Sequence, residues 1–345
     1  MSIIASERPG VFTQYDMSGV VSYSSVGKAV GVAAQSNKAV EGISLITREA
    51  QALELFGEDD NGILMGMIRV LLQNGTTKIY VACSGNEEES QSATTDSYKS
   101  CFNQLAEVAE VGVLTTDSVL PDVAKALASV VDAAAKNRHE MIGVAADSAS
   151  TAVTTAAAMN SERMVLHAQG DGRVSAAIAA KIAELSDPAQ PLTGEVLLGI
   201  EQQTQPLTED QIDTYILGGV TPLESILGQM QIIRCVSTKT KTGAASDSSF
   251  RDINIILTVD TVLKAIREAL TLRMKGAKNN QRTLDAIATQ TQIELQAKQD
   301  AEIINSYETP YVSIDASNPT LCLVEVTFTV TSGLNQIRIT AHVSV

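Results

Sequence analysis

The sequence has few residues that could form an aromatic or a basic surface. None of its 345 residues is tryptophan, and aromatic residues make up only 3% of the chain. Lysine and arginine total 25 against 40 aspartate and glutamate residues, which gives a formal net charge of −15 at pH 7. Proteins bind single-stranded nucleic acid through aromatic side chains in a basic groove, and duplexes through basic surfaces. The composition therefore argues against nucleic-acid binding.

Cysteine and histidine are equally sparse. The cysteines are widely spaced and form no CxxC pair, which is typical of free thiols in a reducing compartment. None of the three histidines has a second histidine or a cysteine at ligand spacing, so we expect no metal site. The four cysteines are Cys83, Cys101, Cys235 and Cys322.

Long apolar runs and familiar catalytic motifs are also lacking. No stretch reaches the roughly 18 apolar residues that a membrane helix needs. The opening residues, MSIIASERPG, lack the basic segment of a signal peptide. The sequence contains no P-loop and no GxSxG nucleophile motif. We therefore expect a protein made in the cytoplasm, without a cofactor and without a catalytic site.

The first two thirds of the chain alternate between short apolar segments and helical segments. Apolar segments of this kind, set between helices, are typical of a parallel sheet that is covered on both faces. We expect a three-layer α/β domain over residues 21–240, in which residues 201–240 form a connecting region. Four of the predicted strands span residues 78–83, 111–116, 141–146 and 163–168.

The pattern changes after residue 240. Residues 241–250 contain the stretch KTGAASDSS, which is mostly small and polar, and they are predicted to be a flexible linker. A strand is expected over residues 253–259, followed by a helix capped by Asp260. A long helix comes next, and alternating apolar residues near the end of the chain predict antiparallel strands. Residues 251–345 therefore form a predicted α+β domain, and the fold class is α/β plus α+β.

The stretch ERPGVFTQYD, residues 7–16, is unusual so near the start of a chain. Pro9 and Gly10 disfavour a helix, so the segment is expected to be extended. Val11 and Phe12 are apolar but too isolated to form a core. Residues 1–20 are therefore predicted to be an arm that needs a partner elsewhere.

One segment resembles a cofactor-binding turn. The sequence GDGRVS begins at Gly170, between a predicted strand and a predicted helix, where a dinucleotide-binding turn would lie. Its third glycine is replaced by Ser175, and the segment follows the last strand instead of the first. A tight strand-to-helix turn explains both glycines equally well. A nucleotide-binding α/β enzyme that uses Gly170–Arg173 remains the alternative function.

Basic residues gather in one part of the predicted second domain. Between residues 262 and 282 there are six lysines and arginines and a single acid, Glu268. Two interpretations stay open: a solvated helix end, or a surface for an acidic partner. The six basic residues are Lys264, Arg267, Arg273, Lys275, Lys278 and Arg282.

Several motifs resemble those of the tail sheath proteins of contractile phage tails and R-type bacteriocins. They are LTEDQIDTYILGGVTPLE, GQMQIIRCVSTKT and FRDINIILTVDTVLKAIREAL, all after residue 206. The opening RPGVF, Arg8 to Phe12, is similar to the RPGVY element of that family. The later motif that runs from Arg234 to Thr238 departs from the family pattern, because Ser237 replaces its first threonine. The positions that carry the resemblance are Gly219, Val220, Arg234, Thr238, Asp252 and Asp260.

The resemblance implies a structural protein without a cofactor. Sheath subunits form six-membered rings that stack around a tube and contract to drive it through a cell envelope. The implied partners are further copies of the chain, the tail tube protein, and the baseplate and tail terminator proteins. The implied location is the bacterial cytoplasm during synthesis and the phage tail or bacteriocin particle afterwards. A capsid or secretion-system structural protein remains a further alternative.

The resemblance also assigns roles to particular residues. The two ends of the chain are expected to complete β-sheets in neighbouring subunits, which would give the N-terminal arm its partner. The residues expected to take part in this strand exchange are Pro9, Gly10, Val11, Phe12, Ile337, Ile339, Ala341 and Val343. The inner domain is expected to contact the tube through Arg273, Lys275, Lys278 and Arg282.

Overall fold

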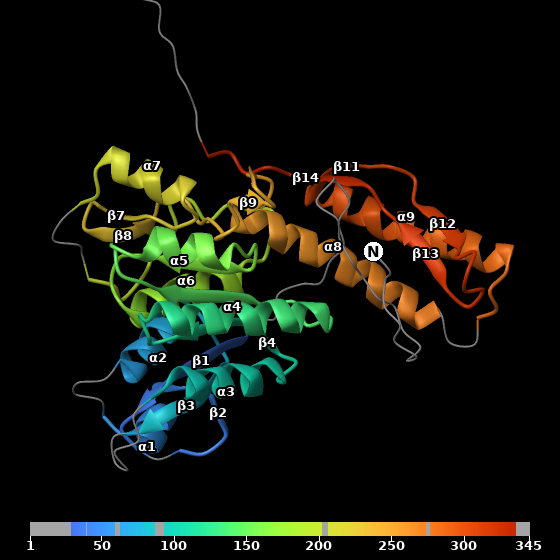
Figure 1. Cartoon of the computed structure of the whole chain (residues 1–345). Helices are drawn as coiled ribbons and strands as arrows, with labels where there is room; N and C mark the ends of the chain where they lie inside the picture. Colours follow the sequence, from blue (N-terminus) through green and yellow to red (C-terminus); the bar gives the residue numbers. More distant parts are fainter. Residues whose placement is uncertain are drawn as a thin grey trace, which may run out of the picture. The chain divides into compact units, whose positions relative to one another are not determined.

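The computed structural model of the chain describes residues 29–335, except residues 39, 59–62, 87–92, 202–205 and 274–276 (Figure 1). These residues divide into two compact units. The larger unit contains residues 29–186, 190–256 and 332–335, and the smaller contains residues 187–189 and 257–331. The predicted N-terminal arm and the strand-exchange residues at both ends lie outside the described residues.

A six-stranded sheet forms the centre of the larger unit. Its strand order is β2-β3-β1-β4-β5-β6, and every neighbouring pair is parallel except β2 and β3. The predicted mostly parallel sheet in a mixed α/β fold is therefore confirmed. The strands are β1 (Ala29–Ser36), β2 (Ile43–Ile46), β3 (Ile79–Asn86), β4 (Val111–Thr116), β5 (Ile142–Ala146) and β6 (Met164–His167).

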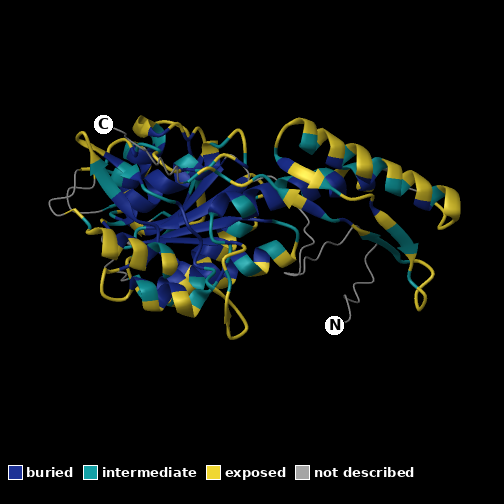
Figure 2. Cartoon of the chain, turned by 90° about the horizontal axis from the view of Figure 1, so that it is seen from above, coloured by how far each residue is buried: buried dark blue, intermediate teal, exposed yellow. Residues whose placement is uncertain are grey.

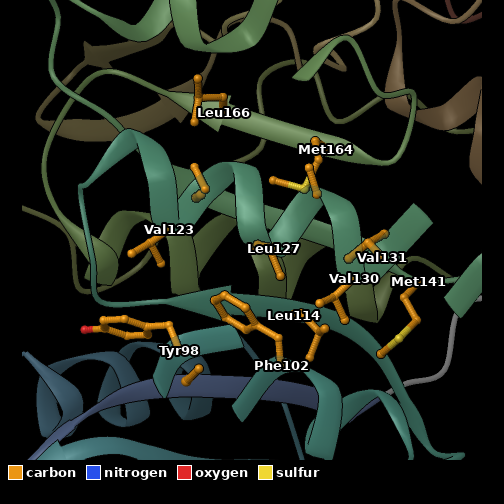
Figure 3. Packing of buried hydrophobic residues seen from close by; sticks show 14 of the residues in the cluster. Tyr98, Phe102, Leu114, Val123, Leu127, Val130, Val131, Met141, Met164 and Leu166 are labelled. Atoms are coloured by element: carbon orange, nitrogen blue, oxygen red, sulfur yellow. The ribbon is translucent and has the colours of Figure 1, made fainter. Parts of the chain in front are cut away.

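Helices pack against this sheet. Phe102 of α3 and Leu127 of α4 meet Leu114 of β4 in one apolar cluster (Figure 3). Helices α2 and α6 contact each other and the sheet but contribute no residue to that cluster, so they cover the opposite face. The helices are α1 (Glu49–Phe56), α2 (Leu64–Gln73), α3 (Thr95–Ala106), α4 (Pro121–Lys136), α5 (Ala152–Met159) and α6 (Gly172–Glu184).

The region after the sheet contains short elements. They are α7 (Glu209–Leu217), β7 (Leu223–Ile226), β8 (Gln229–Ile232), β9 (Lys241–Thr242) and β10 (Ala245–Ser246). Residues 241–250 were predicted to be a flexible linker, but within them β9 and β10 pair as a hairpin. Asp247 fixes the end of the hairpin by accepting hydrogen bonds from the Thr242 hydroxyl and from the backbone N–H of Ser249.

The smaller unit contains most of α8 and two ribbons of strands. Strand β11 pairs with β14, and β12 pairs with β13, both antiparallel. Figure 2 shows the exposed side of α9 and the largely buried strands of the central sheet. The elements are α8 (Ile253–Arg273), α9 (Gln281–Asp300), β11 (Ile304–Tyr307), β12 (Tyr311–Ile314), β13 (Cys322–Glu325) and β14 (Phe328–Val330).

Helix α8 corrects two predictions. Residues 253–259 were expected to be a strand, but they form the first two turns of the helix. Nearly every side chain here is buried, and a continuous apolar run looks the same for a buried strand and a buried helix. Asp260 consequently lies inside the helix and does not cap it. The division between the two units falls within α8, between Ile256 and Leu257, and not at residues 241–250.

Among the described residues, no helix is both long enough and apolar enough to span a bilayer.

Candidate functional site

The motif residues gather beside β6, at the edge of the central sheet. The backbone N–H of Thr221 donates to the carbonyl of Leu166 at 2.7 Å, and the N–H of Thr238 donates to the carbonyl of Met164 at 2.8 Å. Ser237 forms an antiparallel bridge with Val165. Two motif segments that lie well after β6 in the sequence therefore cover this edge strand and satisfy its backbone groups.

Arg234 and Asp252 form an ion pair through two hydrogen bonds. The Nε atom of Arg234 lies 2.6 Å from Oδ1 of Asp252, and Nη2 lies 2.8 Å from Oδ2. Both side chains are about four-fifths buried, with relative exposures of 24% and 19%. The hydrogen bonds that Arg234 donates to Asp252 raise the pKa of Arg234, so the guanidinium stays charged. The pair ties the segment after β8 to the start of α8.

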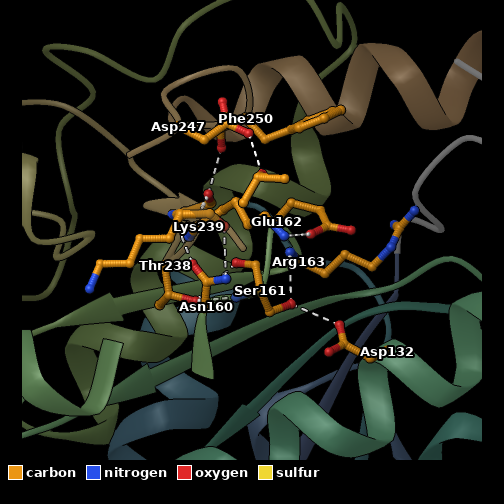
Figure 4. A network of polar contacts seen from close by, with 12 residues as sticks. Asp132, Asn160, Ser161, Glu162, Arg163, Thr238, Lys239, Asp247 and Phe250 are labelled. Carbon is orange, nitrogen blue, oxygen red and sulfur yellow. Dashed lines mark hydrogen bonds and ion pairs between the residues drawn. The ribbon is translucent and has the colours of Figure 1, made fainter. Parts of the chain in front are cut away.

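Thr238 belongs to a second polar network (Figure 4). Its hydroxyl accepts a hydrogen bond from the N–H of Ser161 at 3.0 Å and donates one to the carbonyl of Ser161 at 2.9 Å. The amide of Asn160 bonds the backbone of residues 240 and 241. Asn160 ends α5 in the left-handed region, with φ of 43°, where asparagine is favoured. These bonds fix the segment around Thr238 relative to β6.

Gly219 and Val220 have packing roles. Gly219 has φ of +76°, and a Cβ atom there would lie 3.0 Å from the Cα of Thr238 and 3.1 Å from the carbonyl oxygen of Ser237. Only glycine allows this approach without strain. Val220 is fully buried in the core of the larger unit. The structure thus brings together Gly219, Val220, Arg234, Thr238 and Asp252, while Asp260 is buried separately in α8.

The turn at Gly170–Arg173 is explained by packing. The Asp171 side chain accepts from the N–H of Arg173 at 2.9 Å and pairs with the Arg173 guanidinium at 2.7 Å. The start of α6 therefore already holds a carboxylate, which would repel a phosphate. A Cβ atom on Gly172 would lie 2.6 Å from the Cα of Asp117. Close packing against β4 accounts for this glycine without a nucleotide.

Asp117 lies at the carboxyl ends of β1 and β4, a place where α/β enzymes commonly bind ligands. Asp117 accepts hydrogen bonds from the Tyr98 hydroxyl at 2.6 Å and from the N–H of Gln35 at 2.9 Å. Burial raises the pKa values of both Asp117 and Tyr98. A buried tyrosine and a partly buried aspartate bonded to each other are therefore found at this position.

Within the described ranges, no group of three or more His, Cys, Asp or Glu side chains could hold a metal ion. His167 is fully buried, and its Nε2 and Nδ1 atoms lie 2.7 Å from the Ser175 hydroxyl and 3.0 Å from the Gln169 carbonyl. Both ring nitrogens of His139 contact backbone carbonyls. These two histidines serve the fold.

Comparison with known proteins identifies the second domain. Residues 245–344 match the family model of the phage tail sheath C-terminal domain. The match covers 100 of the 345 residues and agrees with the predicted resemblance to contractile tail sheath proteins over that part of the chain. No curated protein matches the chain.

Solved structures share the fold of this chain along most of its length. The anti-feeding prophage baseplate contains a chain with a TM-score of 0.71 at 15% identity, covering 99% of this chain and 100% of that one. The contracted helical sheath of the same particle gives a TM-score of 0.68 at 15% identity, with 99% of each chain covered. The sheath tail protein of Desulfitobacterium hafniense also gives 0.68, at 11% identity, covering 93% and 100%.

Two of the four basic residues predicted to face a tube can be placed in the structure. Lys278 and Arg282 are exposed, on either side of the start of α9. The side chain of Arg273, at the end of α8, and the whole of Lys275 lie outside the described residues. Sequence reasoning missed Asn160 and Ser161, although an asparagine directly after a predicted helix is a known end signal.

Proposed function

We propose that the chain is a sheath subunit that polymerises as stacked six-membered rings around a tail tube and contracts to drive the tube through a cell envelope. The observation that carries this proposal is the match of residues 245–344 to the sheath C-terminal domain. The likeness of nearly the whole chain to a contracted helical sheath supports it. The implied partners are other copies, the tube, the baseplate and the terminator proteins.

The ribbons of the smaller unit are suitable acceptors for strand exchange. Among the described residues, β12 and β13 pair only with each other, as do β11 and β14. A two-stranded ribbon is marginal in water, and its free edge can accept another strand. Tyr311 of β12 is 61% exposed, and Ile314 is 41% exposed. We infer that residues 9–12 and 337–343 of neighbouring copies add to these edges.

A deletion tests the strand exchange. Removing residues 1–20 takes away a strand donor but none of the described contacts of the central sheet. The truncated chain is expected to fold and to stay monomeric in sedimentation velocity at concentrations where the full chain forms large polymers. Polymers of equal size from both proteins would refute the role of the N-terminal arm.

The basic residues between α8 and α9 are proposed to face the tube. Lys278 and Arg282 are exposed, and Arg273 and Lys275 lie within a few residues of them in the sequence. In a chain with a net charge of −15, such a cluster favours an acidic partner. Contacts between exposed charges weaken as salt rises, so they can be released when the sheath contracts.

Charge reversal tests this surface. Lys275→Glu with Lys278→Glu should prevent polymerisation on tubes, while circular dichroism shows an intact fold. The matched control is Lys99→Glu with Lys136→Glu, which changes the net charge equally at exposed positions of α3 and α4. Normal sheathed tails from the first variant would contradict the assignment, as would equal loss in both variants.

Contraction is proposed to draw its energy from the lattice. Rings assembled in an extended form would be trapped until subunits slide into a more tightly packed arrangement. Each subunit contributes on the order of a few kcal/mol, but the sum over many copies is large. This mechanism requires no nucleotide hydrolysis by the chain.

A further inference from the structure

We propose that Asp252 and Thr193 form a clasp that holds the root of the C-terminal arm on the larger unit through Asn335. The Oδ1 atom of Asn335 accepts a hydrogen bond from the Thr193 hydroxyl at 3.0 Å. Its Nδ2 atom donates to Oδ2 of Asp252 at 3.4 Å. A carboxylate only accepts, so the amide nitrogen must face Asp252, and both ends of the amide are used.

The acidic part of the clasp is held in place before the arm arrives. Arg234 binds both oxygens of Asp252, and Asp252 also forms an antiparallel backbone bridge with Val236. The carboxylate is therefore oriented by the larger unit alone. Asn335 adds a third hydrogen bond to a group whose direction is already set, which reduces the entropy lost when the segment binds.

A second contact lies two residues earlier. A Cβ atom on Gly333 would lie 2.9 Å from Cβ and 3.0 Å from Cγ of Pro191, so glycine permits this close approach. Between these contacts, Leu334 is 72% exposed. Gly333 and Asn335 thus follow the segment of Pro191 and Thr193, with Leu334 facing outward.

The position of the clasp gives it meaning for assembly. Thr331 still belongs to the smaller unit, where its hydroxyl donates to the carbonyl of Glu302 at 2.7 Å, whereas residues 332–335 belong to the larger unit. Asn335 directly precedes residues 336–345, which hold the C-terminal strand-exchange positions. The clasp therefore fixes the point from which the arm departs. This inference rests on the proposed function.

A double-mutant cycle on the full chain tests the docking itself. Asn335→Ala and Thr193→Ala should each lower the equilibrium constant for folding by about three- to tenfold, because each breaks a hydrogen bond. The double variant should lose less than the product of the two effects, since the groups are coupled. Leu334→Ala, at the exposed neighbouring position, should change little. Strictly multiplicative effects in urea unfolding would overturn the clasp.

A second measurement tests its role in assembly. At a temperature where the variants remain folded, Asn335→Ala should slow polymerisation about fivefold or more, while Leu334→Ala should match the wild type. Coupling in the cycle together with unchanged polymerisation of Asn335→Ala would overturn the assembly role. If the wild-type chain itself fails to polymerise, the proposed function is wrong, and the cycle still decides whether Asn335 is docked.

Discussion

Arg234 binds Asp252 through two nearly parallel hydrogen bonds of 2.6 and 2.8 Å. The two residues are 18 positions apart in the sequence, and the structure joins them across the hairpin of β9 and β10. Because both side chains are largely buried, the carboxylate has lost much of its hydration. Without Arg234, nothing in the pair would compensate for that loss. The pair is therefore expected to matter more for stability than an exposed ion pair.

Replacing Arg234 by lysine tests this relationship. Lysine keeps the charge but cannot form two parallel hydrogen bonds, so Arg234→Lys should lower the free energy of unfolding by about 1–2 kcal/mol. The matched control is Arg69→Lys, whose exposed pair with Glu49 should change stability by less than about 0.5 kcal/mol. Urea unfolding followed by circular dichroism measures both, and equal losses would contradict the assigned importance of the pair.

Gly172 provides a test of the packing role given to the turn before α6. Gly172→Ala places a Cβ atom against backbone atoms of Asp117 and Thr116, which cannot move away easily. A loss of about 2–4 kcal/mol in the free energy of unfolding is expected. Gly194→Ala is the control, because it has φ of +80° but no atom within 4 Å of the added carbon, and it should lose about 1 kcal/mol.

Calorimetry with ATP or NAD should show no binding to the wild type. Binding abolished by Gly172→Ala would instead support the nucleotide alternative.

His167 is expected to make the chain sensitive to acid. Burial lowers the pKa of His167 from 6.5 to about 4. As the pH falls from about 6.5 to about 4, the unfolded chain binds a proton that the folded chain does not, so stability is lost on acidification. This one group can account for up to about 3 kcal/mol. Replacing His167 by glutamine should remove that part of the pH dependence in urea unfolding between pH 4 and 7. An unchanged slope in the variant would show that the ring titrates normally in the folded chain.

Leu227 occupies a strained position at the tip of the hairpin of β7 and β8. It has φ of 50° and is 99% exposed, followed by Gly228 at φ of 84°. Two positive φ values in a two-residue loop favour Asn-Gly over Leu-Gly. Leu227→Asn should therefore stabilise the chain by about 1 kcal/mol, since it relieves strain and exposes no core. Ser225→Asn is the control, as Ser225 lies within β7. A less stable Leu227→Asn variant would mean that the leucine makes contacts in solution.

The α/β part of the fold could be read from the sequence because its signals are local. Strand β4 begins and ends at the predicted residues 111 and 116, and α4 begins at Pro121 as expected. Like the other predicted strands of the central sheet, β4 is a short apolar run between segments in which apolar residues recur at helical spacing. Helix α8 could not be read in this way, since burial around nearly its whole first half hides the helical period.

The site could be predicted only in part. Motif resemblance named Arg234 and Asp252, but nothing in their spacing indicated that they bind each other. Asn335 carries no pattern at all, because its contacts come from residues more than 80 and 140 positions away. Contacts of this kind are set by the tertiary fold, and a single sequence does not encode them in any local period.

Negative-stain electron microscopy of the purified full chain tests the central claim most directly, since that claim is that the β-structure of one copy is completed by others. The account predicts striated hollow cylinders from the full chain and none from a chain without residues 1–20. Isolated monomers at every concentration, in the presence of tubes as well as in their absence, would contradict it.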